Sequence, residues 1–214
     1  SDSGEILLAA GNSVELVNPN SPDLRVLITA PDNQAVNVGQ IIAQNGNIGI
    51  YGGLVRQGGI VSANSAVMGP NGKIVFKATK DVTLDVGSST TANGAQGGSI
   101  TVQSDIGTTL VSGAVEAKGD QGAGGQVQIL GNLVGLTGNA IIDASGQTGG
   151  GTVLVGGDYH GNNPGVQNAW RTYVGPDATV RADAIQSGAG GKVIVWSDDV
   201  TRYYGSIYAR GGAQ

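Results

Sequence analysis

Acidic side chains are the residues of this sequence that are most capable of chemistry. Carboxylates close to one another, or to arginine or lysine, can serve as acid and base in the cleavage of polysaccharides. The candidates are Asp81, Asp85, Asp143, Asp183, Asp198, Asp199 and Arg202. No three of these acids share one position in the repeating pattern of the chain, and several stand where a turn former is expected. The sequence therefore predicts no catalytic residues and no enzymatic activity.

A second candidate is the segment 158–177, which gathers residue types that stack on sugars and hydrogen-bond to them. Its possible ligand-binding residues are Tyr159, His160, Trp170, Arg171 and Tyr173. The alternative interpretation is that Trp170 and Tyr173 only anchor this segment to the rest of the molecule. Of the two, the anchoring interpretation is favoured, and both remain open at this point.

Metal and cofactor chemistry has little support in the residues. The chain has one histidine, His160, and no cysteine, so the usual zinc sites are excluded. The stretch "GGDYHGNN" does not match the calcium-binding nonapeptide repeat. The glycine-rich stretch "GGTVLVGG" at 150–157 would need a following helix to bind phosphate, and no helix is expected there. We expect no metal site and no cofactor.

A repeated motif explains these glycines. The pattern Gly-x-apolar-x-apolar begins at Gly4, Gly46, Gly72, Gly98, Gly125, Gly151 and Gly191. The intervals between the copies are 42, 26, 26, 27, 26 and 40 residues, and a constant period of this size is typical of solenoid proteins. The two longer intervals predict insertions at about 18–38 and 158–177.

Two further strand-like patterns recur in each unit. One is a β-branched residue followed two positions later by alanine, from Ile41–Ala43 to Ile207–Ala209, which places both residues on one face of a strand. The other is an apolar alternation, clearest at Val14–Leu16, Val82–Leu84 and Thr108–Leu110. Three short strands per unit predict an all-β fold, a parallel β-helix of about seven to eight rungs. A right-handed coil is expected because parallel crossover connections almost always have that hand.

Composition and charge agree with this fold and exclude several functions. Glycine supplies 39 of the 214 residues, while only 4% are aromatic, so the core must consist of small and β-branched side chains. The net charge of −5, with scattered basic residues, argues against nucleic acid as a partner. No apolar segment approaches the length that spans a membrane, so membrane insertion is not expected.

The insertions should pack on the helix. The first contains an apolar run, Leu24 to Ile28, which predicts an extra strand lying over a face of the helix. Leu7, Leu154 and Ile194 are apolar at an outward position where Thr101 and Gln128 are polar. We therefore expect each insertion to cover its own rung and to shield those apolar residues.

Three stretches resemble the filamentous haemagglutinin-type exoproteins of bacterial two-partner secretion. They are "ITAPDNQAVNVGQIIAQNGNIGIYGGLVRQGGIVSANSAV", "GGTVLVGGDYHGNNPGVQNAWRTYVGPDATVRADA" and "GGKVIVWSDDVTRYYGSIYARGGAQ". The resemblance implies a β-helical adhesin, secreted through an outer-membrane transporter to the bacterial cell surface. It also implies roles in attachment, aggregation or biofilm, with surface or matrix polysaccharide or a host receptor as partner.

The chain departs from that family at its export motifs. The family's Asn-Pro-Asn-Gly and Asn-Pro-Asn-Leu motifs are not present: Asn18, Pro19 and Asn20 are followed by Ser21. We therefore expect residues 1–214 to be a single β-helix segment of a longer exoprotein, lying at the end of the export domain or beyond it. On this expectation, transporter recognition belongs to the parent protein and not to this segment, whose own role is that of a structural shaft.

Overall fold

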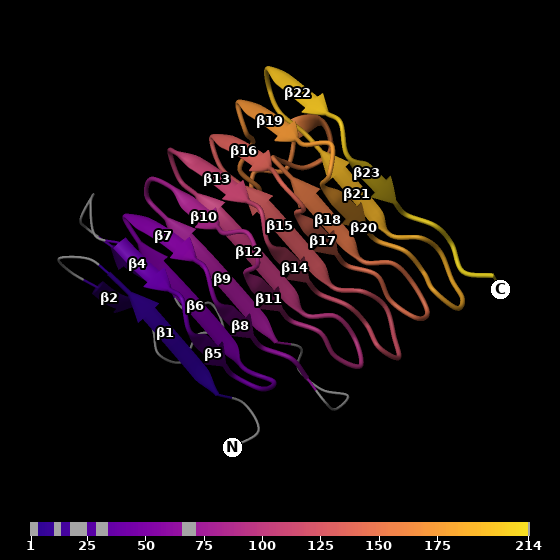
Figure 1. Ribbon diagram of the computed structural model, residues 1–214, viewed down its shortest axis with the longest axis horizontal. Helices are drawn as coiled ribbons and strands as arrows, with labels where there is room; N and C mark the ends of the chain where they lie inside the picture. Colours follow the sequence, from indigo (N-terminus) through magenta and orange to yellow (C-terminus); the bar gives the residue numbers. More distant parts are fainter. Residues whose placement is uncertain (1–3, 11–13, 18–24, 29–33, 66–71, 214) are drawn as a thin grey trace.

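The protein is a parallel β-helix in which successive turns of the chain stack along one axis (Figure 1). The computed structural model describes residues 4–10, 14–17, 25–28, 34–65 and 72–213. Within these ranges the chain forms three parallel sheets of seven strands each, one two-stranded hairpin and a single 3-10 helix, η1 (Tyr159–Gly161). Each turn, or rung, contributes one strand to every sheet. This confirms the predicted all-β solenoid of about seven rungs with three strands per rung.

The strands are short, as the sequence period requires. The first sheet consists of β1 (Glu5–Ala9), β6 (Asn47–Gly52), β9 (Lys73–Ala78), β12 (Ser99–Ser104), β15 (Gln126–Leu130), β18 (Thr152–Val155) and β21 (Lys192–Val195). The second consists of β4 (Gln34–Asn37), β7 (Leu54–Gln57), β10 (Val82–Leu84), β13 (Thr108–Val111), β16 (Leu133–Leu136), β19 (Arg171–Val174) and β22 (Val200–Tyr203). The third consists of β5 (Gln40–Ile42), β8 (Ile60–Ser62), β11 (Ser89–Thr91), β14 (Ala114–Glu116), β17 (Ile141–Asp143), β20 (Thr179–Arg181) and β23 (Ser206–Tyr208).

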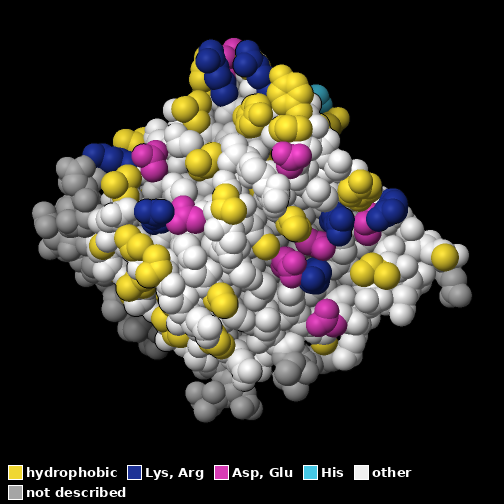
Figure 2. Space-filling view, in the orientation of Figure 1, with side chains coloured by type: hydrophobic (Ala, Val, Ile, Leu, Met, Phe, Trp, Pro, Cys, Tyr) yellow, Lys and Arg dark blue, Asp and Glu magenta, His cyan; other side chains and the backbone are white. Residues whose placement is uncertain are grey.

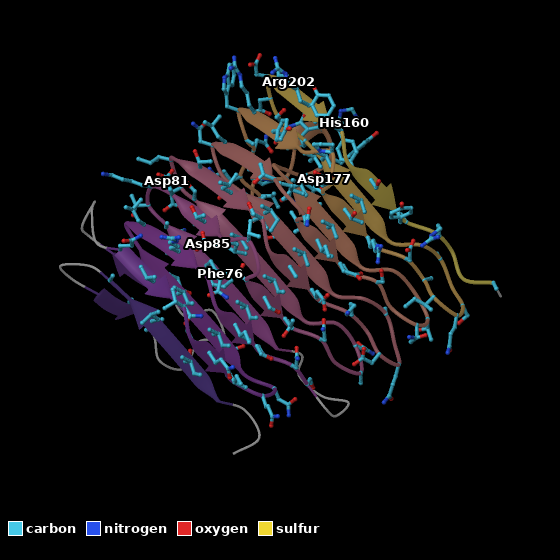
Figure 3. The ribbon with its side chains drawn as sticks, in the orientation of Figure 1. Phe76, Asp81, Asp85, His160, Asp177 and Arg202 are labelled. Carbon is cyan, nitrogen blue, oxygen red and sulfur yellow. The ribbon has the colours of Figure 1, made fainter. Side chains whose placement is uncertain are left out.

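The interior is filled by ladders of aliphatic side chains. Alternate residues of each strand point inward, and the register places the same position of each rung above the last. One ladder of the first sheet runs through Ile6, Ile48, Ile74, Ile100, Val127, Val153 and Val193. Phe76, the single phenylalanine, is fully buried in the neighbouring ladder (Figure 3). The core therefore extends along the axis as a continuous column.

Alanine and glycine form the corner between the third sheet and the first sheet of the next rung. The repeated alanines from Ala43 to Ala182 are at most 5% exposed. The N–H of Gly151 donates to the carbonyl oxygen of Ala144 at 2.7 Å, and the N–H of Gly125 donates likewise to Ala117. A Cβ atom on Gly151 would overlap the carbonyl oxygen of Gly125 in the rung beneath. The close stacking of rungs thus requires glycine at this corner.

The first insertion contains an antiparallel hairpin of β2 (Val14–Val17) and β3 (Arg25–Ile28). The apolar alternation at Val14–Leu16 is therefore not a rung strand, and that prediction is wrong, because its strand pairs locally with β3. The second-sheet strand of the first rung is instead β4, which pairs with β7 inside the predicted range 18–38. The extra strand predicted at Leu24 to Ile28 is confirmed over Arg25–Ile28, and it contacts β6. Residues 18–24 and 29–33 of this insertion lie outside the described residues.

In the described parts of the chain, no helix is both long and apolar enough to cross a membrane.

Candidate functional site

The second insertion leaves the shaft after β18 and packs against the outer face of the first sheet. Val166, 9% exposed, forms a small apolar cluster with Leu130, Leu154 and the partly buried Ile194. These three partners come from successive rungs of the first sheet. The prediction that this insertion shields Leu154 and Ile194 is confirmed.

Amide side chains extend this attachment toward the N-terminal rungs. The Nε2 atom of Gln167 donates to the carbonyl oxygen of Asp105 at 3.0 Å, while Gln103 donates to Gln167 Oε1 at 2.9 Å. Ala169, fully buried, returns the chain to the shaft, and its N–H donates to the oxygen of Gly156 at 2.6 Å. The insertion is therefore anchored by small, apolar and amide residues.

Two of the predicted site residues, Tyr159 and His160, lie at the exposed tip of this insertion. Their rings meet edge to face with centroids 4.1 Å apart, and the ring of Trp196 lies 6.2 Å from that of His160. Asp158 holds the turn because its carboxylate accepts hydrogen bonds from Asn163 and from the N–H of Tyr159. These bonds, the Asn163 bond foremost, lower the pKa of Asp158. The three rings form an aromatic cluster in which Tyr159 and His160 are exposed and Trp196 is half-buried.

The other predicted residues face elsewhere. Trp170 is 52% exposed at the corner before β19 and makes no ring contact within the described structure. Arg171 and Tyr173 lie on the outer face of the second sheet. Arg171 Nε donates to Asp199 Oδ2 at 2.8 Å, and the Tyr173 ring lies 5.9 Å from that of Tyr204. The structure therefore separates the five predicted residues and does not bring them into one site.

A groove of about 330 Å³ lies beside Arg171 and Tyr173. Its lining also includes Leu133, Val200 and Arg202, from the rungs on either side of β19. Leu133 and Val200 were not predicted as site residues, and Arg202 was considered only as a cation near acidic residues. The rung period could have found Val200, which the pairing register places beside Arg171, but the second insertion interrupts the period between Leu133 and Arg171.

Several of the acidic residues considered for catalysis connect neighbouring rungs, while Asp143 and Asp198 accept hydrogen bonds from residues two positions away. Asp85 accepts a hydrogen bond from Arg56 at 2.8 Å, and the N–H of Thr108 donates to Asp81. Asp183 likewise binds Arg210. Each of these pairs joins residues that are 27 to 29 positions apart, which is one rung. The described residues contain no group of three or more His, Cys, Asp or Glu that could hold a metal ion.

The fold and this surface place the chain among the parallel β-helices. The chain is similar to the crystal structure of the HMW1 secretion domain from Haemophilus influenzae, with 31% sequence identity and a TM-score of 0.70. The likeness covers 99% of this chain and 49% of that one, so this chain spans about half the length of that domain. No protein-family model matches the chain, and no curated protein matches it.

Proposed function

We propose that this chain is a β-helical part of the secretion domain of a large bacterial exoprotein exported by two-partner secretion. The observation that carries the proposal is the likeness to the HMW1 secretion domain over 99% of the chain. That neighbour supports the wider class of two-partner secretion exoproteins and not filamentous haemagglutinin in particular. The likeness also favours a position within an export domain. The sequence had led us to expect a position at the end of that domain or beyond it.

The role of the segment in the exported protein is mechanical. Stacked rungs with a filled aliphatic interior make a stiff shaft, which would hold an adhesive region away from the bacterial cell. The acidic residues support a role without catalysis, because Asp85, Asp183 and Asp199 are engaged in ion pairs to arginines. The parent protein, secreted or held at the cell surface, would serve attachment, aggregation or biofilm formation.

Export through the transporter can be tested directly. The 214-residue chain is placed behind a signal peptide in a Gram-negative host, with or without the two-partner-secretion transporter of its own genome. We expect folded chain in the medium only when the transporter is present, while a periplasmic marker enzyme stays inside the cells. Retention of folded chain in the periplasm despite the transporter would contradict the proposal.

A second candidate function is carbohydrate binding through the segment 158–177. The exposure of its aromatic residues favours it: Tyr159 is 69% exposed, Trp170 52% and Tyr173 39%. Because the predicted residues separate into two surfaces, a single site formed by the insertion alone is not supported. Arg171 and Tyr173 belong to the groove on the second sheet, and that groove is the stronger candidate surface.

A further inference from the structure

The groove on the second sheet is formed by three consecutive strands, β16, β19 and β22. Two outward ladders cross it side by side: Leu133, Arg171 and Val200 in one, Gly135, Tyr173 and Arg202 in the other. Figure 2 shows basic side chains on both sides of an acidic one at the upper end of the molecule, with hydrophobic side chains below them. Figure 1 places β16, β19 and β22 at that same end. The groove thus combines cationic and apolar surface.

One ladder position beside the groove has no side chain. Leu110 occupies this position on β13, but Gly135 follows it on β16. A Cβ atom at Gly135 would lie 3.0 Å from Leu110 Cδ1, so the Leu110 side chain covers Gly135, which is buried. A volume of about 330 Å³ is at the lower end of the range found for small-ligand sites.

The groove offers one aromatic ring and aliphatic side chains to a ligand. Tyr173 lines the groove and is 39% exposed. The ring of Tyr204, which is 61% exposed, lies next to that of Tyr173 with the two planes tilted by 53°. Leu133 and Val200 are also close to 40% exposed on the same face. Exposed tyrosine faces and aliphatic groups complement the C–H faces of pyranose rings while their polar ends remain in water.

The charges in the groove select an anionic ligand. Arg171 is paired with Asp199, so these two side chains nearly cancel. Arg202 is exposed and has no hydrogen-bond or ion-pair partner among the described residues, so its guanidinium is uncompensated there. It lines the groove together with Tyr173, and Figure 3 shows it at the upper end of the molecule. A guanidinium binds carboxylates through two parallel hydrogen bonds. The groove therefore fits a carboxylate carried on a flat, partly apolar ring.

A peptide strand fits less well. It cannot add to the backbone of β16 or β19, because both strands are already paired on both sides.

We infer that this groove binds an acidic matrix polysaccharide, with a uronate carboxylate on Arg202 and sugar rings on Tyr173 and Tyr204. The inference rests on the second candidate function, carbohydrate binding, and is independent of export. Its test uses purified chain, so failure of export and failure of binding are separate results.

Binding is measured by calorimetry on the 214-residue chain with hexamers of galacturonate and of mannuronate. The matched neutral probe is a hexamer whose carboxyl groups have been reduced to alcohols. We expect saturable binding of at least one uronate hexamer, weakened by added salt, and at least about tenfold weaker binding of the neutral probe. No binding of either uronate, or equal binding of the neutral probe, would overturn the inference.

Variants then locate the site. Arg202→Gln should weaken uronate binding at least about tenfold, whereas Arg202→Lys should retain part of it. Tyr173→Ala should also weaken binding without changing the circular dichroism spectrum. Arg56→Gln is the matched control, because Arg56 lies on the same outward ladder at the other end of the sheet and is exposed. An equal loss in Arg56→Gln would refute the groove as the site, and equally tight binding of hexaglutamate would refute the preference for sugar rings.

Discussion

At the scale of single residues, polar side chains join each rung to the next. Inside the second sheet, Asn37 Nδ2 donates to Gln57 Oε1 at 2.7 Å, and Gln57 in turn donates to the carbonyl oxygens of Gly59 and Ser89. Gln57 is fully buried, and these bonds satisfy its amide. On the outer face, Arg210 donates two side-chain hydrogen bonds to Asp183. The repeat thus carries specific polar contacts as well as apolar stacking.

The bond between Asp183 and Arg210 makes the stability of the chain depend on pH. The Arg210 guanidinium, and secondarily the Arg210 N–H, lowers the pKa of the Asp183 carboxyl below its ordinary value. The stabilisation is therefore complete above the unfolded pKa of about 3.9 and is lost as the pH falls through the folded pKa. We expect Asp183→Asn to lower the Tm at pH 7 by a few degrees, with a difference from the native chain that shrinks toward about pH 3.

Thermal melts between neutral and acidic pH measure this effect. Asp177→Asn is the control, because Asp177 is exposed and makes no hydrogen bond or ion pair within the described structure. A deficit in Asp183→Asn that stays the same at every pH would show that the carboxylate charge plays no part.

At the scale of elements, the corner of alanine and glycine sets the spacing between rungs. A methyl group on Gly98 would overlap the carbonyl oxygen of Gly72 in the rung below, and it would also press on Ala92. We expect Gly98→Ala to destabilise the chain by about 2 kcal/mol, because backbone on both sides prevents relaxation. Urea unfolding measures the change.

Gly39→Ala serves as the control for that substitution. A Cβ atom at Gly39 would meet only Asn37 Oδ1, at an ordinary contact distance of 3.8 Å. Its free energy of unfolding should stay within about 0.5 kcal/mol of the native value. If both substitutions cost the same, the stacking of rungs does not depend on glycine at the corner.

At the scale of the whole molecule, each rung is stabilised by its neighbours. The central strands β9, β12 and β15 pair on both sides and enclose fully buried ladders, whereas Val193 and Val195 of the last rung are only partly buried. In the 214-residue chain we expect amide hydrogens of β21, β22 and β23 to exchange at least about tenfold faster than those of β12 and β15. Hydrogen exchange followed by mass spectrometry tests this, and uniform protection along the chain would instead indicate a single cooperative unit.

The sequence predicted the shaft because the pattern of apolar residues that forms one rung is local and is repeated along the chain. Ile74 and Phe76 are two positions apart, as are Ile142 and Ala144. Residues at that spacing lie on the same face of a strand, so each pair points into the core of a parallel stack. The second insertion was located by the interval between Gly151 and Gly191 alone. The same reasoning failed at Val14–Leu16, where an alternating strand pairs with a local hairpin partner and resembles a rung strand in sequence.

By itself, then, the sequence determined the period, the glycine corner and the inward faces of the first and third sheets, because each depends on residues within one rung. In the second sheet the alternation at Thr108–Leu110 marks outward residues, and the buried residues of β13 are Thr109 and Val111. Only the tertiary structure decided which outward side chains meet. Leu133, Tyr173 and Arg202 belong to three different rungs, and the second insertion separates the first from the second. Their contact depends on the register between rungs and on the side to which the insertion folds, and no local pattern encodes either. The division of the predicted aromatic residues between two surfaces follows from the same cause.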